Sequence, residues 1–224
     1  MGQSFYEADA DARAVFDEAS ELLGYDMKAL CFEENEKLNL TQYTQPAMVT
    51  TGIAIMKAVE KQGLLPDTAA GLSLGEYEAL YAAGALSVTD AIRVVARRGE
   101  LMEAAVPAGV GAMAAVLGAE ASLIEETLSE IPEVWIANYN CPGQIVISGK
   151  KEAVEAAAEA LKARGIKRVL MLNVSGPFHS GLLREAGEAL GKVLAETEIH
   201  PLRIPYYANV TGDIVEDAAK VRGL

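Results

Sequence analysis

The sequence predicts an α/β fold in which a smaller β-α-β-β-α-β segment is inserted into a longer chain of helices and short strands. Three observations lead to this prediction. Helical periodicity dominates the first part of the chain, short apolar runs end in glycine-rich turns, and the middle of the chain alternates short strands with helices. With 224 residues, 51% of them hydrophobic and 23% charged, the chain can bury a substantial core.

The N-terminal part of the chain has the pattern of amphipathic and buried helices. Apolar residues recur at helical spacing over residues 10–23, and a largely apolar helix is predicted over residues 45–63. Pro46 suits the first turn of that second helix, because a first-turn residue needs no N–H partner, and Gly63 suits its C-terminal stop.

Two further helices follow a glycine-rich turn. The short apolar segment over residues 68–73 leads into a helix over about 75–83, which stops at Gly84. Residues 87–90, Ser-Val-Thr-Asp, are typical of an N-cap, so a long helix is predicted from there to about residue 105.

The middle of the chain predicts a self-contained unit. Its elements are a strand over 109–118, a helix over 121–130, strands over 133–140 and 143–149, a helix over 151–164 and a strand over 166–174. This order is the ferredoxin-like arrangement. We therefore predict an inserted domain over residues 109–174 and a core domain made of residues 1–108 and 175–224, the latter with a helix over 181–196.

Composition narrows the class of protein. The net charge of −13 and the pI of about 4.6 disfavour binding to nucleic acid or to an anionic membrane. Two cysteines are too few for a disulfide scaffold or a zinc site. The acidic N-terminus lacks the features of a signal peptide, and no apolar run approaches the ~20 residues of a membrane span. We expect a cytoplasmic protein.

Ser73 lies between Gly71 and Gly75 in the pattern Gly-x-Ser-x-Gly, between a predicted strand and a predicted helix. In that context the tight turn exposes the serine hydroxyl, and the helix N-terminus supplies N–H groups for a developing oxyanion. The pattern alone is weak, and a small residue in a glycine-rich connection is the other interpretation. With the strand–turn–helix context, a nucleophilic serine and a small connecting residue both stay open as interpretations of Ser73.

A serine nucleophile needs a base, and the chain has two histidines. His200 precedes Pro201 and has the character of an ordinary surface or turn residue. His179 lies at the junction of a predicted strand and helix, where α/β folds gather their sites. It is either the base or a helix-start residue satisfied by nearby backbone, and the first interpretation is favoured.

Arg98 is placed by helical periodicity on the core-facing side of its helix. It shares the direction of Ala91, whereas Arg93 and Arg97 point to the opposite, polar side. An unpaired guanidinium there is costly. Arg98 therefore has either a structural carboxylate partner or an anionic ligand, and composition alone favours the structural pair.

Taken together, the segments GLSLGEYEAL, RRGELM, GAMAAVLG, NYNCPGQIVISG and VSGPFHS closely resemble the malonyl-CoA:acyl carrier protein transacylase family of bacterial fatty-acid synthesis. The resemblance extends in register across essentially the whole chain. It implies an α/β-hydrolase-like core with a parallel sheet and an inserted ferredoxin-like subdomain, in agreement with the organisation above.

The resemblance also implies roles. Ser73 takes the malonyl group as an ester, His179 activates the serine and then the incoming thiol, and Arg98 binds the free malonyl carboxylate. The Leu74 N–H is an oxyanion donor, and Gln45 lines the pocket.

Two more residues complete the implied site, Asn138 in the predicted insert and Phe178 in the segment that follows it. Phe178 resembles the malonyl-selecting form of the family, and Asn138 faces the cleft or stabilises a turn. The substrates implied are malonyl-CoA and the phosphopantetheine thiol of acyl carrier protein, with no cofactor and no metal. A basic segment over residues 162–168 either docks the acidic carrier or is a solvated helix end.

The chain departs from the family pattern in two places. Many members have histidine where this chain has Leu72, a position that is not the base. The family also has an N-terminal strand and loop that supply a second oxyanion N–H, and segments beyond the equivalent of Leu224. We therefore expect a chain truncated at both ends. The rival functions are a serine thioesterase or hydrolase, and a catalytically impaired fragment that only binds carrier protein.

Overall fold

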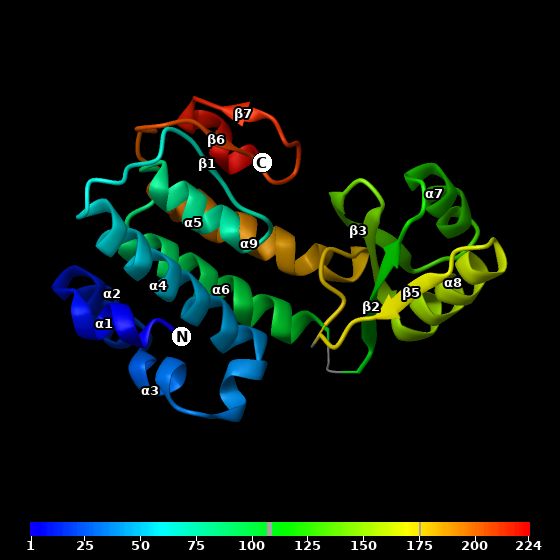
Figure 1. The fold of residues 1–224 in the computed structure, drawn as a ribbon, viewed down its shortest axis with the longest axis horizontal. Helices are drawn as coiled ribbons and strands as arrows, with labels where there is room; N and C mark the ends of the chain where they lie inside the picture. The colour runs from blue at the N-terminus through cyan, green and yellow to red at the C-terminus, as the bar shows by residue number, and fades with distance from the viewer. Residues whose placement is uncertain (107–108, 175) are drawn as a thin grey trace. The chain divides into compact units, whose positions relative to one another are not determined.

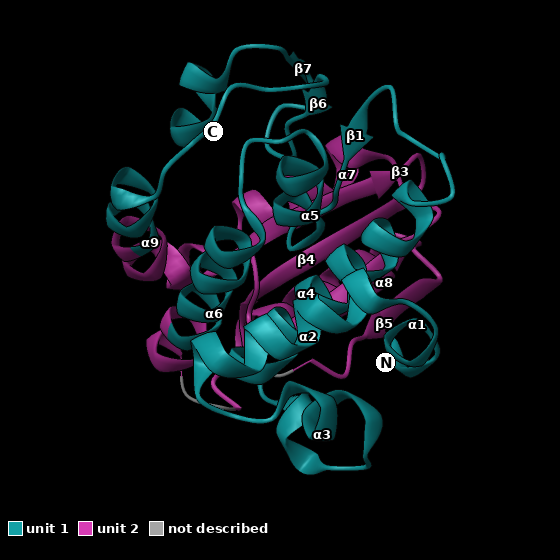
Figure 2. Cartoon of the chain, turned by 90° about the vertical axis from the view of Figure 1, so that its left-hand side faces the viewer, with its two compact units in different colours: residues 1–100, 190–224 teal, residues 101–189 magenta. Residues whose placement is uncertain are grey.

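A computed structural model describes residues 1–106, 109–174 and 176–224 of the chain. It divides into two compact units, residues 1–100 with 190–224 and residues 101–189 (Figures 1 and 2). Each unit has its own cluster of buried apolar side chains. The predicted insert, 109–174, lies within the second unit, while the predicted domain boundaries at residues 108 and 175 lie outside the described residues.

The first unit is mostly helical. Its elements up to the first strand are α1 (Gln3–Ala8), α2 (Ala10–Leu23), α3 (Met27–Phe32), the 3-10 helix η1 (Glu36–Asn39) and α4 (Thr41–Glu60). Capping explains the bounds of α2, which match the prediction: the Asp9 side chain accepts hydrogen bonds from the N–H groups of Asp11 and Ala12, and Gly24 ends the helix at φ 74°. The short helices α1 and α3 were not predicted, because six residues carry too little periodicity.

The prediction for Pro46 is wrong. We placed it in the first turn of a helix that begins at residue 45, but α4 begins at Thr41 and Pro46 lies inside it. The first turn is instead formed by polar residues, Thr41-Gln42-Tyr43-Thr44, and the Thr44 hydroxyl donates to the Leu40 carbonyl at 2.9 Å. These residues lack the apolar periodicity from which the start was predicted.

A sheet of three short strands joins the two parts of the chain that make up the first unit, residues 1–100 and 190–224. β1 (Ala69–Ala70) pairs in parallel with β6 (Tyr206–Tyr207), and β6 pairs in antiparallel fashion with β7 (Ile214–Val215). After β1 come α5 (Gly75–Ala82) and α6 (Val88–Ala105), both close to their predicted bounds. The Asp90 N–H donates to the Ser87 hydroxyl at 3.0 Å, as the N-cap prediction requires.

The second unit contains the ferredoxin-like arrangement. Its elements are β2 (Gly111–Leu117), α7 (Ala121–Ser129), β3 (Val134–Cys141), β4 (Gln144–Lys150), α8 (Lys151–Ala163) and β5 (Arg168–Met171). The strands form one antiparallel sheet in the order β3-β4-β2-β5. The last strand is shorter than predicted, because only Arg168–Met171 pairs with β2.

The C-terminal part of the chain continues with η2 (Gly181–Leu183), α9 (Arg184–Glu196) and η3 (Ala218–Gly223). The helix predicted over 181–196 therefore begins with a 3-10 turn. None of the helices in the described part of the chain has the length and hydrophobicity of a transmembrane span.

Glu78 is a partly buried carboxylate between α4 and α5. A Cβ atom on Gly52 would lie 2.5 Å from a Glu78 carboxylate oxygen, so the glycine makes room for it. Glu78 has no hydrogen-bond or ion-pair partner within the described residues, and burial raises the pKa of its carboxyl. The folded state therefore binds this proton more readily than the unfolded state does, and the ionised form destabilises the fold.

We predict that Glu78→Gln raises the melting temperature at pH 8. Below the ordinary glutamate pKa of 4.5 Glu78 is protonated in both states, and the destabilisation develops as the pH rises through the raised folded-state pKa. The difference between variant and wild type should therefore shrink toward pH 4.5. Thermal unfolding across this range tests it, with the exposed Glu34→Gln as control. An equal shift at all pH values would contradict the assignment.

Candidate active site

Ser73 lies in the turn between β1 and α5 with a left-handed backbone, φ 52°. Among the described residues, three that are not glycine have positive φ, namely Ser73, Glu133 and His179. Such conformations cost of order 1 kcal/mol or more, and they gather at functional sites. Two of the three are the residues predicted to be nucleophile and base.

The two glycines beside Ser73 are not equivalent. A Cβ atom on Gly71 would lie 1.9 Å from the Gly75 carbonyl oxygen and 2.5 Å from the Glu76 backbone nitrogen. A Cβ atom on Gly75 would have no neighbour within 4 Å. The sharp turn therefore requires glycine at position 71 and tolerates a side chain at position 75.

Arg98 contacts Ser73 directly. Its Nη2 donates to the Ser73 hydroxyl oxygen at 3.2 Å, and its Nη1 donates to the Gln45 side-chain oxygen at 2.7 Å. The guanidinium carbon lies 5.8 Å from the centre of the Tyr77 ring. Three predicted site residues thus form one cluster, with Tyr77 as a fourth member that the sequence analysis missed.

The structure resolves the alternatives left open for Arg98 in part. In the described part of the chain no aspartate or glutamate forms an ion pair with it. Its partners are a neutral amide, a hydroxyl and an aromatic face. A structural carboxylate is therefore not what accounts for its inward position.

Close packing of two helices brings Arg98 to Gln45. A Cβ atom on Gly99 would lie 2.8 Å from the Thr41 carbonyl oxygen, so the glycine lets α6 approach the first turn of α4. Arg93 and Arg97 are exposed on the opposite side of α6, as predicted from periodicity.

The electrostatics of the cluster are those of a desolvated cation. Burial lowers the pKa of the Arg98 guanidinium, and the nearby Tyr77 and Glu76 oppose that shift. Burial raises the pKa of the Glu76 carboxyl, against a hydrogen bond from the Asn209 backbone and the charge of Arg98. Arginine stays protonated in proteins, so the cluster presents a positive charge beside the Ser73 hydroxyl.

Two backbone N–H groups near Ser73 have different surroundings. The Ser73 N–H donates to the Asn209 side-chain oxygen. The Leu74 N–H donates to no acceptor within the described residues. Leu74 lies at the N-terminus of α5, where the helix dipole favours negative charge, so its N–H is open to an oxyanion.

His179 lies in the second unit and is exposed, in a segment held by two close contacts. A Cβ atom on Gly111 would lie 2.4 Å from the Pro177 ring, and one on Gly181 would lie 2.6 Å from the Trp135 ring. The sheet thus fixes the backbone on both sides of His179, which has φ 57°. The pairing of His179 with Ser73 stays a prediction.

The other two predicted residues of the second unit are Phe178 and Asn138. Phe178 is half-buried, and its N–H donates to the Gly176 carbonyl at 3.0 Å. Asn138 lies on β3, next to a register shift after Ile136. His200 is partly exposed, and its Nδ1 lies 3.6 Å from a Glu198 carboxylate oxygen, as expected for a residue near the surface.

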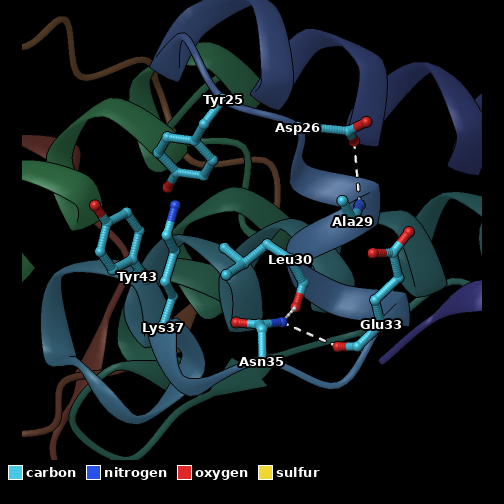
Figure 3. Close-up of a pocket in the computed structure, with 8 residues that line it drawn as sticks. All are labelled: Tyr25, Asp26, Ala29, Leu30, Glu33, Asn35, Lys37 and Tyr43. Atoms are coloured by element: carbon cyan, nitrogen blue, oxygen red, sulfur yellow. Dashed lines mark hydrogen bonds between the residues drawn. The ribbon is translucent and has the colours of Figure 1, made fainter.

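A cavity elsewhere in the first unit contains none of the predicted site residues (Figure 3). Its volume of about 260 Å³ is below the roughly 300–1,000 Å³ of typical ligand pockets. The Lys37 side chain, one of those that line this cavity, points between the Tyr25 and Tyr43 rings. The described residues contain no group of three or more potential metal ligands.

Comparison with known proteins gives the family. The model of the acyl transferase domain matches residues 1–221. The malonyl CoA-acyl carrier protein transacylase of Bacillus subtilis is 46% identical over 99% of this chain and 72% of the relative. The chain belongs to the malonyl CoA-acyl carrier protein transacylase family. The Escherichia coli K12 transacylase is 43% identical over 91% of this chain and 70% of its own length.

Solved structures of transacylases agree in fold. The crystal structure of the Streptococcus pneumoniae protein matches with a TM-score of 0.95 and 43% identity, covering 100% of this chain and 74% of that one. The complex of a malonyl-transacylase with a type II polyketide acyl carrier protein contains a chain with a TM-score of 0.92 and 41% identity, covering 97% of this chain and 72% of that one. The predicted α/β fold with a small antiparallel subdomain is confirmed.

We predict that Gly71→Ala lowers the free energy of unfolding by at least about 2 kcal/mol, as overpacking against backbone does. Gly75→Ala is the matched control in the same motif and should change it by less than about 1 kcal/mol, because its Cβ atom meets nothing. Urea unfolding of both variants measures the difference. Equal losses would contradict the asymmetry of the turn.

Proposed function

We propose that this chain transfers the malonyl group from malonyl-CoA to the phosphopantetheine thiol of acyl carrier protein, through a malonyl ester of Ser73, in fatty-acid biosynthesis. The observation that carries this proposal is the hydrogen bond from the Arg98 guanidinium to the Ser73 hydroxyl. A cation in contact with the nucleophile selects an acyl group whose carboxylate lies close to its reacting carbonyl. Malonyl, with one carbon between the two groups, meets this requirement.

The first step forms the acyl-enzyme. The Ser73 oxygen attacks the thioester carbonyl, and His179 accepts the hydroxyl proton. The Leu74 N–H stabilises the oxyanion, while Arg98, held by Gln45, binds the substrate carboxylate. The carbon–sulfur bond then breaks, and coenzyme A leaves as the thiol with the proton from His179.

The second step runs the same chemistry toward the carrier. The phosphopantetheine thiol gives its proton to His179, and its sulfur attacks the malonyl-serine carbonyl. The serine ester bond breaks, and Ser73 regains its proton from His179. No redox change occurs, so neither step needs a redox cofactor. Phe178 and Asn138 are proposed to line the acyl site.

Acyl carrier protein is the proposed partner. A relative was solved as a complex of an acyl carrier protein with its malonyl-transacylase. In the basic segment, Lys162 pairs with Glu159 and Arg164 with Glu126, whereas Lys167 and Arg168 are exposed. The last two are the cations we propose for docking an acidic carrier. The cytoplasmic location stays a prediction.

The two rival functions give different products. A serine thioesterase would also use Ser73 and Leu74, but a cation without a carboxylate partner has no task in releasing a neutral acyl group to water. It would release malonate steadily in the absence of a thiol. A fragment that only binds carrier protein would form no acyl-enzyme at all.

We predict that wild-type protein incubated with malonyl-CoA gains one malonyl group on Ser73 and that Ser73→Ala gains none, because the attacking oxygen is absent. Intact-mass spectrometry with peptide mapping measures the adduct, with the exposed Ser4→Ala as control. An unchanged adduct in the Ser73 variant would refute the assignment of the nucleophile.

We predict that Arg98→Ala lowers the preference for malonyl-CoA over acetyl-CoA, as a ratio of kcat/KM, by at least about tenfold. A hydrogen bond to a charged group contributes about 1.5–3 kcal/mol. Removing Arg98 takes this contribution from malonyl-CoA but not from acetyl-CoA, because the acetyl group has no carboxylate. Arg93→Ala is the matched control, since Arg93 is exposed on the same helix and lies 3.5 Å from Asp90. Selectivity that stays unchanged in the Arg98 variant would end the carboxylate assignment.

A further inference from the structure

The backbone of Ser73 is bound to a residue far away in the sequence. Its N–H donates to the side-chain oxygen of Asn209, 136 positions later. Because a backbone N–H can only donate, the Asn209 side chain must present its oxygen and not its nitrogen to Ser73. This residue has no place in the reaction steps above.

The topology of the short parallel sheet explains how the two residues meet. Ala70 of β1 pairs with Tyr207 of β6. Ser73 follows its strand by three positions and Asn209 follows its own by two. Parallel strands end at the same edge of a sheet, and in α/β folds that edge carries the site. Asn209 therefore reaches the turn of Ser73 from the neighbouring strand.

Asn209 is itself held in place. Its backbone N–H donates to the Glu76 carboxylate at 2.9 Å, and Glu76 lies in the first turn of α5, directly after the turn of Ser73. Next to it, the Ala208 N–H donates to the Asp213 carbonyl at 3.0 Å and the Gly212 N–H donates to the Ala208 carbonyl at 2.8 Å. These two bonds close the turn after β6, and Asn209 connects that turn both to Ser73 and to Glu76 at the start of α5.

We infer that Asn209 is a positioning residue for Ser73, and that Glu76 orients it. The hydrogen bond to Asn209 supports the left-handed backbone of Ser73, which on its own is unfavourable. It also removes the Ser73 N–H from the set of oxyanion donors and leaves the Leu74 N–H for that role. Without the acceptor, Ser73 is free to relax, and its hydroxyl moves away from the reacting geometry.

This inference rests on the proposed function, because its test follows acylation of Ser73. We expect Asn209→Ala to lower the single-turnover rate of malonyl transfer to Ser73 by about 10²-fold, the effect of a displacement of about 1 Å at a reacting atom. KM for malonyl-CoA and the preference for malonyl over acetyl should change little, because Arg98 and Gln45 keep their contacts.

The conservative variant separates positioning from stability. Asn209→Asp keeps an acceptor oxygen for the Ser73 N–H, so it should restore the acylation rate to within about tenfold of wild type. Val210→Ala, in the same turn at a residue that is 69% exposed, is the matched control and should acylate at the wild-type rate. Circular dichroism and thermal unfolding accompany every rate.

Each outcome decides the matter. Slow acylation by folded Asn209→Ala, with recovery in Asn209→Asp, supports the inference. Normal acylation by Asn209→Ala, or an equally slow Asn209→Asp, overturns it. If Asn209→Ala does not fold, the rate of Asn209→Asp decides alone, and loss of folding in both variants assigns Asn209 to stability and overturns the inference. Absence of a Ser73 adduct in the wild type would instead reject the proposed function.

Discussion

The guanidinium of Arg98 must stay charged and half-buried although no carboxylate of the described residues forms an ion pair with it, and its surroundings in the first unit are built to allow this. The Gln45 amide oxygen and the Ser73 hydroxyl accept two of its N–H groups, and Tyr77 presents a ring face. Gly99 permits the close helix packing that brings these groups together. These neutral partners accept two of the guanidinium N–H groups, and the Glu76 carboxyl acts on the charge only without an ion-pair contact, so the cluster can still bind an anion.

A second constraint is the conformation of Ser73. The left-handed backbone and the close approach of residues 71 and 75 leave glycine as the only residue that fits position 71. The parallel pairing of β1 with β6 then supplies a partner for the Ser73 N–H from the other end of the chain. β1 and β6 have two residues each and are too short to bury much surface. Their contribution is to hold the turn of Ser73 and the turn of Asn209 next to each other.

Much of this fold follows from local pattern, and the exceptions have identifiable causes. The bounds of α2 were predicted because capping residues mark both ends. The start of α4 was not, because its first turn is polar, and β1 and β6 were too short for alternation to be read. Periodicity placed Arg98 on the inward face but could not name Gln45 as its partner, since that contact joins two helices.

The remaining site residues show the same division between local and distant information. Ser73 and Gly71 lie in one motif, so their turn could be predicted from spacing. Asn209 lies 136 positions from Ser73, and its only local signal is that of a turn residue after an apolar run. Tyr77 was missed because a tyrosine on an amphipathic helix is ordinary core material until its ring is seen beside a guanidinium.

The contact between Arg98 and Ser73 also bears on how a diacid is distinguished from a monoacid. When a guanidinium N–H donates to the serine oxygen, it occupies a lone pair that the oxygen needs to attack a carbonyl, and the serine is a weaker nucleophile. A carboxylate is a stronger acceptor than a hydroxyl, so on the proposed function a bound malonyl group draws the guanidinium toward itself and frees the nucleophile. An acetyl thioester has no carboxylate and leaves the serine oxygen engaged. Recognition of the carboxylate and activation of the serine are then two effects of one side chain, because the energy of binding the acid group is expressed at the reacting atom.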